Sequence, residues 1–95
     1  MTKLVWSDEA EQNLHTIMDF IARDSLARAV RFVKDIKRQT ERLKRFPHSG
    51  RVVPELSDQL GPPREILIGT YRIIYHVRPK HIEIVTVFHG MRKLH

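Results

Sequence analysis

The sequence predicts an α+β fold in which an antiparallel helical hairpin packs on one face of a small, mainly antiparallel sheet. Apolar residues recur at helical spacing over residues 8–23 and again over 26–46. Residues 64–68 and 71–78 then flank a glycine turn, and 81–88 form a third β-rich stretch. The apolar stripes of the two helices have to be buried, and one face of the sheet can cover them.

The composition sets broad limits on the class of protein. With 95 residues and 41% apolar positions, residues 1–95 are enough for one compact domain. The absence of cysteine excludes a disulfide framework, and the six histidines lack the spacing of metal ligands, so we expect no metal or other cofactor. Neither a signal peptide nor a membrane span of about 20 apolar residues is recognisable, so a soluble cytoplasmic protein without a membrane partner is expected.

The charge balance favours an anionic partner. Seventeen Lys and Arg residues against eleven Asp and Glu residues give a formal net charge of +6. Such an excess favours contact with nucleic acid, an acidic protein or both, although many small proteins are basic without binding either. Residues 26–45 carry eight cations and two acids, which predicts a basic outer face on the second helix. A solvated helix face is the alternative interpretation.

Local signals mark where the helices begin and end. Residues 3–6 form a short strand, and Ser7 can cap the first helix. Asp24 or Ser25 can cap the second helix, and Pro47 prevents its continuation. Because so few residues separate the two helices, they have to form an antiparallel hairpin.

Residues 47–63 predict a long surface loop. The segment has four prolines, two glycines and no sustained periodicity. A loop of this length inside a small domain is unusual enough to suggest a role in function.

Two tight turns set the expected register of the sheet. Gly69-Thr70 is a two-residue hairpin turn with glycine where a positive φ is needed, and Pro79-Lys80 forms the second turn. The expected pairs are Tyr71, Ile73 and Tyr75 with Phe88, Thr86 and Ile84 on one side, and with Ile68, Ile66 and Arg64 on the other. This more apolar face should carry the helical hairpin, with both tyrosines in the core.

The opposite face of the sheet is predicted to hold aliphatic residues among scattered polar and charged ones. The latter include Glu65, Arg72 and His89. His76 should lie opposite Glu83 there as a structural cross-strand pair. No further element remains in the chain to cover this face, so we expect a partner to cover it. The residues expected to bind that partner are Leu67, Ile74, Val85 and Val87.

One ordered set of motifs spans nearly the whole chain. It consists of Trp6-Ser7, Ala10, Leu14, Ile21-Ala22, Ala29, Phe32, Leu43, Phe46-Pro47, Gly50-Arg51, Val53-Pro54-Glu55, Arg64-Glu65-Ile66, Tyr71-Arg72-Ile73-Ile74-Tyr75 and His89-Gly90-Met91-Arg92. In this order and spacing, the set resembles the ParE/RelE superfamily of toxins from type II toxin–antitoxin systems, also called the plasmid stabilisation family.

The resemblance implies a toxin that inhibits bacterial growth. It implies a cognate acidic antitoxin, usually encoded beside the toxin, whose C-terminal segment wraps around it in a hetero-oligomer. ParE-like members poison DNA gyrase and are not enzymes, whereas RelE-like members are endoribonucleases that cut messenger RNA on the ribosome. The segments 51–55 and 89–92 are closer to the ParE branch. RelE-like cleavage is the alternative, and a non-toxic nucleic-acid-binding relative is a third interpretation.

Candidate site residues follow from these two targets. RNA cleavage needs a general acid or base and cations that hold the phosphate. For cleavage the candidates are His89 or His48 as acid or base, with Arg51, Arg64, Arg72 and Arg92 on the phosphate. RelE-like toxins often carry a tyrosine or a histidine in the C-terminal tail. The tail 92–95 has no tyrosine and only His95 could substitute, which counts against cleavage. For contact with the target we expect His89, Arg92 and Arg51.

Overall fold

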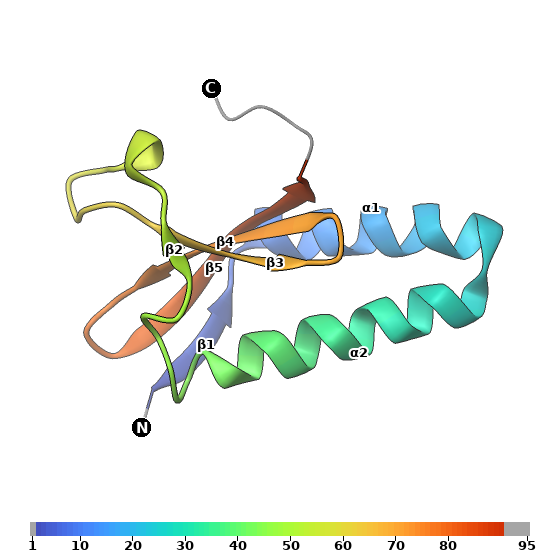
Figure 1. The fold of residues 1–95 in the computed structure, drawn as a ribbon, viewed down its shortest axis with the longest axis horizontal. Helices are drawn as coiled ribbons and strands as arrows, with labels where there is room; N and C mark the ends of the chain where they lie inside the picture. Colours follow the sequence, from blue (N-terminus) through green and yellow to red (C-terminus); the bar gives the residue numbers. More distant parts are fainter. Residues whose placement is uncertain (1, 91–95) are drawn as a thin grey trace.

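The computed structural model describes residues 2–90 and confirms the predicted α+β fold (Figure 1). Its elements are β1 (Lys3–Trp6), α1 (Asp8–Asp24), α2 (Leu26–Arg42), β2 (Arg51–Val52), the 3-10 helix η1 (Pro54–Leu56), β3 (Arg64–Ile68), β4 (Tyr71–Val77) and β5 (His81–His89). The strand order is β1-β5-β4-β3-β2, and only the β1–β5 pair is parallel among these strands. None of the helices described here has the length and apolar character that a membrane span requires.

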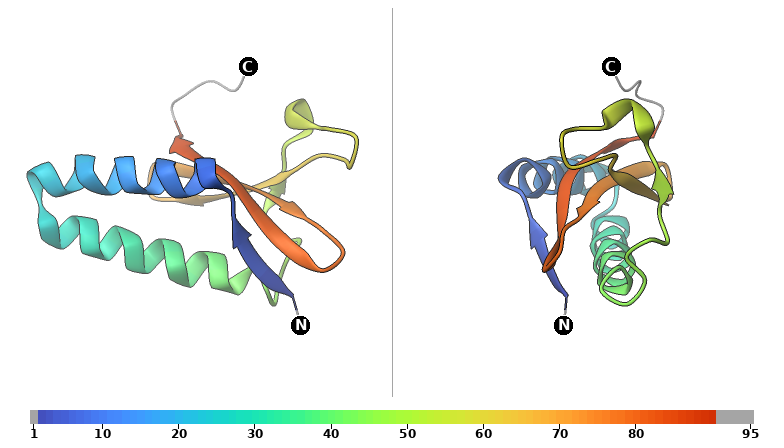
Figure 2. Two further views of the ribbon diagram at one scale, coloured as in Figure 1. Left: turned by 180° about the vertical axis from the view of Figure 1, so that it is seen from behind. Right: turned by 90° about the vertical axis from the view of Figure 1, so that its left-hand side faces the viewer.

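Serine side chains start both helices. Ser7 Oγ accepts a hydrogen bond from the Ala10 N–H at 3.0 Å, as expected for an N-cap. Ser25 Oγ accepts from the Arg28 N–H at 3.2 Å, so Ser25 caps α2 and Asp24 is the last residue of α1. The single residue between the helices forces the tight hairpin that projects beyond the sheet in Figures 1 and 2.

The second helix is shorter than the predicted 26–46. It ends at Arg42, because the Leu43 N–H donates to the Thr40 carbonyl at 3.1 Å and the backbone tightens into turns. Apolar spacing continues to Leu43, whose side chain is buried, so periodicity alone placed the helix end too late.

The main core lies between the helical hairpin and one face of the sheet. Ile36 of α2 and Ile73 and Tyr75 of β4 are completely buried at its centre. The buried members are Ala10, Phe32, Ile36, Leu43, Ile68, Ile73, Tyr75, Ile82, Ile84 and Val87. Burial of each large aliphatic side chain contributes at most about 1.5–3 kcal/mol, before the entropy of ordering it is subtracted.

An asparagine attaches α1 to the edge of β5 where β1 has ended. The pairing of β1 with β5 stops at Trp6 and Ile84. Beyond that point Asn13 Oδ1 accepts hydrogen bonds from the Val87 N–H at 3.0 Å and the Thr86 hydroxyl at 2.9 Å. The side chain therefore supplies an acceptor that a longer β1 would have supplied.

The β3–β4 hairpin has the predicted register. Gly69 has a φ of 60°, in the left-handed region that its turn position requires. Ile68 lies opposite Tyr71 and Ile66 lies opposite Ile73, so this part of the sheet follows directly from the turn chemistry.

A bulge in β5 changes the register that was expected between β4 and β5. Tyr75 pairs with Ile84 as predicted, but Ile74 pairs with Thr86, which leaves Val85 as the extra residue.

Beyond the bulge, each residue of β4 lies opposite a residue one position further along β5 than expected. Ile73 lies opposite Val87, and Tyr71 lies opposite His89. Because side chains alternate between the faces of a strand, Val87 enters the main core, where it is 2% exposed. Its predicted position on the open face is therefore wrong, and Phe88 occupies that face instead.

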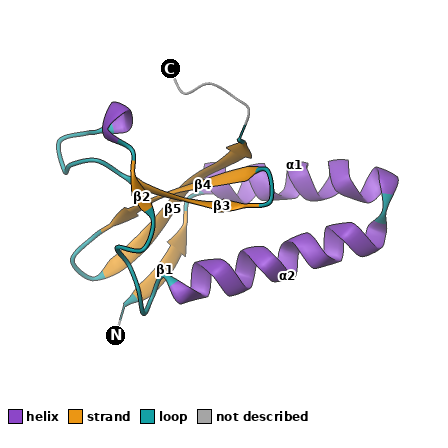
Figure 3. Ribbon diagram, viewed as in Figure 1, coloured by secondary structure: helices purple, strands orange, loops and turns teal. Residues whose placement is uncertain are grey.

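The predicted loop 47–63 covers part of the second face, contrary to the expectation that nothing in the chain remains to do so. Val53 and Leu56 pack on Ile74 and Phe88 in a second, smaller core. Residues 53–63, which include η1, lie on the opposite side of the sheet from α2 (Figure 2, right), whereas the short β2 before them is an edge strand of the sheet itself (Figure 3). Ile74 is consequently 1% exposed in the free chain.

Tyr75 anchors the start of this segment from the centre of the sheet. Its hydroxyl donates to the Pro47 carbonyl at 2.8 Å and accepts from the Gly50 N–H at 2.9 Å. A Cβ atom at Gly50 would lie 2.5 Å from that hydroxyl, so only glycine fits there. Burial raises the pKa of the Tyr75 hydroxyl, which therefore stays protonated and can donate.

Four ionisable residues tie the middle of the segment to β4 and β5. Asp58 Oδ2 lies 3.4 Å from His76 Nε2 and 4.0 Å from Arg78 Nη2. Arg78 Nη2 also lies 3.6 Å from Glu83 Oε1. His76 is opposite Glu83 in the sheet, as predicted, but the carboxylate within salt-bridge distance of its ring is that of Asp58.

The free energy of unfolding should depend on the protonation of His76. Burial, and then the Arg78 charge, lower the pKa of His76 below 6.5, against the opposing effects of Asp58 and Glu83. The unfolded chain therefore binds the proton more readily, and stability is lost as pH falls below about 6.5. In urea denaturation across this pH range, we expect the free energy of unfolding of the His76→Gln variant to fall less with decreasing pH than that of the parent chain. His15→Gln, at an exposed position, should behave like the parent, and parallel curves for His76→Gln and the parent would contradict the prediction.

Candidate target-binding site

A buried carboxylate held by two arginines forms a polar centre on the second face of the sheet. Glu65 of β3 has a side chain that is 3% exposed. Arg51 Nε donates to its Oε2 at 2.9 Å, and Arg72 Nε donates to its Oε1 at 2.6 Å. The Nη2 atom of each arginine contacts the same oxygen as its Nε, so each oxygen serves one guanidinium.

The two arginines differ in how firmly they are held. A buried carboxylate is tolerated only when charge and hydrogen bonds compensate for its lost hydration, and the two guanidiniums supply both. The Arg72 guanidinium also lies 5.4 Å from the centre of the Phe88 ring, and its side chain is 13% exposed. The Arg51 side chain is 74% exposed, so Arg51 presents its charge to solvent while Glu65 fixes its direction.

These residues line a groove with a volume of about 510 Å³. Its other lining residues are Leu67, Gly69, Thr70 and Gly90. Leu67 is 66% exposed, which places a large apolar side chain beside two cations. Two guanidiniums against one carboxylate leave a net positive charge, so the groove suits an anionic group next to an apolar one.

His89 lies on the other face of the sheet from these arginines. Its ring stands edge-on to Tyr71, with 5.5 Å between ring centres, and Tyr71 also packs on Phe32 of α2. Arg72 follows Tyr71 along the strand and therefore points to the opposite face. The bulge in β5 causes this separation, and the expected position of His89 on the open face is wrong.

Arg64 is committed to the backbone of the loop. Its Nη1 donates to the carbonyl of Gly50 at 2.7 Å and to that of His48 at 3.2 Å. Arg64 pairs with Tyr75 and so shares the helix-facing side of the sheet. His48 is exposed beside it, and Arg92 lies outside the described residues. Of the candidates for RNA cleavage among the described residues, the structure brings only Arg51 and Arg72 together.

The residues expected to bind a partner differ widely in exposure. Leu67 is open to solvent, whereas Ile74 and Val87 are buried in the two cores. Val85 is half-buried at the bulge, where its carbonyl accepts a hydrogen bond from the Ser7 hydroxyl at 2.8 Å. The expected open face is therefore wrong for Ile74 and Val87, while partner binding at Leu67 stays a prediction.

The alternation of β3 predicts Glu65 on the second face of the sheet, but the sequence alone did not indicate a role for it. The available signal was a carboxylate at an alternate position of an otherwise aliphatic strand, directly before Ile66. A charge in such a place needs a partner, and the hairpin turn already places Arg72 near it. The contribution of Arg51 could not be found in this way, because β2 was expected to be loop.

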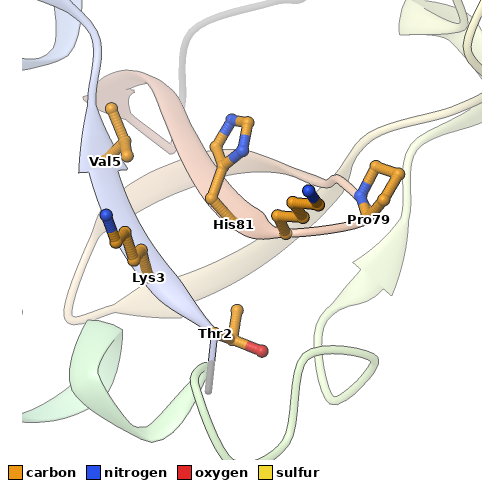
Figure 4. Close-up of a pocket in the computed structure, with 6 residues that line it drawn as sticks. Thr2, Lys3, Val5, Pro79 and His81 are labelled. Carbon is orange, nitrogen blue, oxygen red and sulfur yellow. The ribbon is translucent and has the colours of Figure 1, made fainter.

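A second hollow lies at the opposite end of the same face, between β1 and the β4–β5 turn (Figure 4). Its volume is about 570 Å³, and Lys3, Val5 and His81 project beside it. No carboxylate is among its lining residues, so no acidic group orients its cations as Glu65 orients Arg51.

The fold is shared with chains of two solved toxin–antitoxin structures. The chain is similar to a chain of the chromosomal ParDE toxin–antitoxin system from Pseudomonas aeruginosa, with 22% identity, a TM-score of 0.73 and coverage of 94% of this chain and 96% of that chain. It is also similar to a chain of the RelBE2 toxin–antitoxin complex from Mycobacterium tuberculosis, with 24% identity, a TM-score of 0.55 and coverage of 93% and 96%. A comparison with curated proteins found no match.

The family is shown by the sequence. Residues 4–94 match the family model described as the ParE toxin of the type II toxin–antitoxin system, parDE. The chain therefore belongs to the ParE toxin family.

Removing the charge of Glu65 should destabilise the chain. Glu65→Gln keeps the shape of the side chain but leaves the poorly exposed Arg72 without its counter-charge. We expect the free energy of unfolding to fall by about 1.5–3 kcal/mol in urea denaturation. Glu41→Gln removes a carboxylate from an exposed pair with Lys44 and should change stability by less than about 0.5 kcal/mol. Equal effects of the two substitutions would show that the buried pairs contribute no more than a surface pair.

Proposed function

We propose that this protein inhibits bacterial growth by poisoning DNA gyrase in the cytoplasm and that a cognate antitoxin neutralises it. The observation that carries the proposal is the match to the ParE toxin family over residues 4–94. On this proposal the chain is not itself an enzyme and needs no cofactor. Its role is to bind the target and hold it in an unproductive state.

The geometry of the described residues supports binding rather than RNA cleavage. Cleavage through a ribose hydroxyl needs a proton-transfer group next to the cations that hold the phosphate. His89 and Arg72 are on opposite faces of the sheet, and the lining of the Glu65 groove contains neither histidine nor tyrosine. The one carboxylate of the lining, Glu65, is buried and held by both guanidiniums, so the groove can hold an anion but offers no further group for proton transfer from its lining.

Within the described part of the site, we propose that Arg51 contacts the target. It is exposed, its direction is fixed by Glu65, and it lies near Leu67 in the same groove. A carboxylate or phosphate of the target can pair with its guanidinium while an apolar group packs on Leu67. The target-binding roles of His89 and Arg92 remain predictions that rest on their place at the end of the last strand.

Gyrase poisoning can be measured directly. With purified gyrase and supercoiled plasmid, the chain should increase the amount of DNA that is trapped in cleaved complexes with the enzyme. Arg51→Gln should require about ten times more protein for the same effect, because it removes one charge-assisted contact. Arg23→Gln, an exposed arginine on α1, should retain full potency.

An experiment in growing cells can distinguish gyrase from the ribosome as the target. After induced expression, pulse labelling should show that DNA synthesis stops before protein synthesis. An earlier loss of protein synthesis would instead support RelE-like cleavage of messenger RNA. Unimpaired growth would remove the proposal of toxicity altogether.

We propose that the antitoxin binds the exposed part of the second face around Leu67. Both similar structures come from toxin–antitoxin systems, and the groove pairs an open apolar side chain with the exposed charge of Arg51. An acidic segment with one apolar anchor fits this combination. Charge pairs at its rim should mainly speed association, whereas burial of Leu67 should slow dissociation.

The antitoxin site can be tested with the protein encoded by the adjacent gene. In calorimetry, Leu67→Asp should lower the affinity of the complex at least about ten-fold. The substitution removes the apolar contact and adds a negative charge that repels the acidic antitoxin. Leu60→Asp is the matched control, because Leu60 is 75% exposed and does not line the groove. Arg28→Glu should have a smaller effect than Leu67→Asp. If Arg28→Glu abolishes binding while Leu67→Asp leaves the affinity unchanged, the antitoxin covers α2 instead.

A further inference from the structure

The outer face of α2 carries a straight row of arginines. Arg28, Arg31, Arg38 and Arg42 are all exposed, and their spacing places them within one narrow stripe of the helix. Phe32 lies outside this stripe and is buried against the sheet. At 1.5 Å per residue, the stripe extends for about 21 Å along the helix.

The acids of α2 leave most of this charge uncompensated. The helix has six cations and two acids, Asp35 and Glu41. Asp35 pairs with Arg38 at 3.0 Å and Glu41 pairs with Lys44 at 2.9 Å, both at the surface. Exposed pairs of this kind are weak and readily exchange for other partners.

The arginine stripe is continuous with the Glu65 groove on both sides of β3. Arg42 of α2 and Arg51 of β2 line one groove of about 340 Å³. Arg28 and Arg31 line another of about 320 Å³, together with the turn 69–70, which also lines the Glu65 groove. We call this surface the basic band, and it consists of Arg28, Arg31, Arg38, Arg42, Arg51 and Arg72.

We propose that the basic band binds the phosphate backbone of duplex DNA. A row of phosphates needs only cations, whereas a protein partner draws its affinity from a buried apolar centre. The exposed apolar residues of α2, Leu26 and Val30, lie off the arginine stripe. Arginine also has the planar fork that matches a phosphate. DNA binding is an activity of this chain alone and goes beyond its proposed action on gyrase.

Duplex DNA fits the band better than other nucleic acids do. Single strands are usually held by aromatic stacking, and the one aromatic residue of α2, Phe32, is buried. The deep and narrow major groove of an RNA duplex does not admit a helix, whereas that of B-form DNA does. A helix with its cationic face exposed can therefore approach the DNA backbone over its whole length.

The binding test uses fluorescence anisotropy with a labelled duplex of about two helical turns. The chain should bind the duplex, and its affinity should fall steeply between about 50 and 200 mM salt. The stripe variant replaces three arginines by glutamine, which keeps the helix propensity high. Its substitutions are Arg31→Gln, Arg38→Gln and Arg42→Gln. We expect at least a ten-fold loss of affinity, and a salt dependence that falls by about 0.9 for each contact removed.

A matched control carries the same loss of charge at exposed positions outside the band. Its substitutions are Lys3→Gln, Arg23→Gln and Lys80→Gln. The two lysines of this set line the hollow of Figure 4, so the control also removes the competing cluster of cations. It should keep its affinity within about two-fold of the parent. Circular dichroism and thermal unfolding should show that both variants stay folded.

Three results would overturn the proposal. Equal losses in the two variants would show that net charge alone attracts DNA. Tighter binding to an RNA duplex of the same sequence would assign the band to RNA. Displacement of DNA by polyglutamate at equal charge concentration would assign it to an acidic protein. None of these measurements contains gyrase, so failure here leaves the proposed gyrase poisoning intact, and failure in the gyrase assay leaves DNA binding intact.

Discussion

Strand β4 is buried on both of its faces, and this burial determines how the other elements are arranged around it. Four consecutive residues, Ile73, Ile74, Tyr75 and His76, are at most 9% exposed. Alternate side chains of a strand point in opposite directions, so this run needs a layer on each side of the sheet. The helical hairpin is one layer, and the segment 53–63 is the other. The long connection is therefore required by the sheet, whatever else it does.

The second layer is narrow, and it leaves polar residues at its margins that need partners. His76 meets Asp58 from the covering segment, and Glu65 meets Arg51 from β2. The contacts that compensate these groups for their lost hydration also fix the positions of the side chains at the surface beside them. Arg51 is held in one direction before any partner arrives, so binding loses less side-chain entropy. Packing and recognition thus depend on the same few residues.

The candidate site could be predicted only in part, because it depends on which face each side chain occupies. Arg72 was named from the sequence, and the hairpin turn was sufficient to place it next to Glu65. His89 was assigned to the same face, yet one extra residue at Val85 moves it to the other. A bulge leaves little trace in a strand of β-branched residues, since Val85 has the same propensity as its neighbours. The same shift took Val87 from the expected interface into the core.

Elements whose causes are local could be predicted from the amino-acid sequence. Apolar spacing, the serine caps and the Gly69 turn are properties of adjacent residues, and they were sufficient for the hairpin of helices and the β3–β4 register. The end of α2, the cover over Ile74 and the side chains that meet at Glu65 became known only from the folded chain. These outcomes depend on segments far apart in the chain, such as Arg51 reaching a carboxylate on β3. Contacts of that kind have no local pattern, because each residue's place is set by what lies against it.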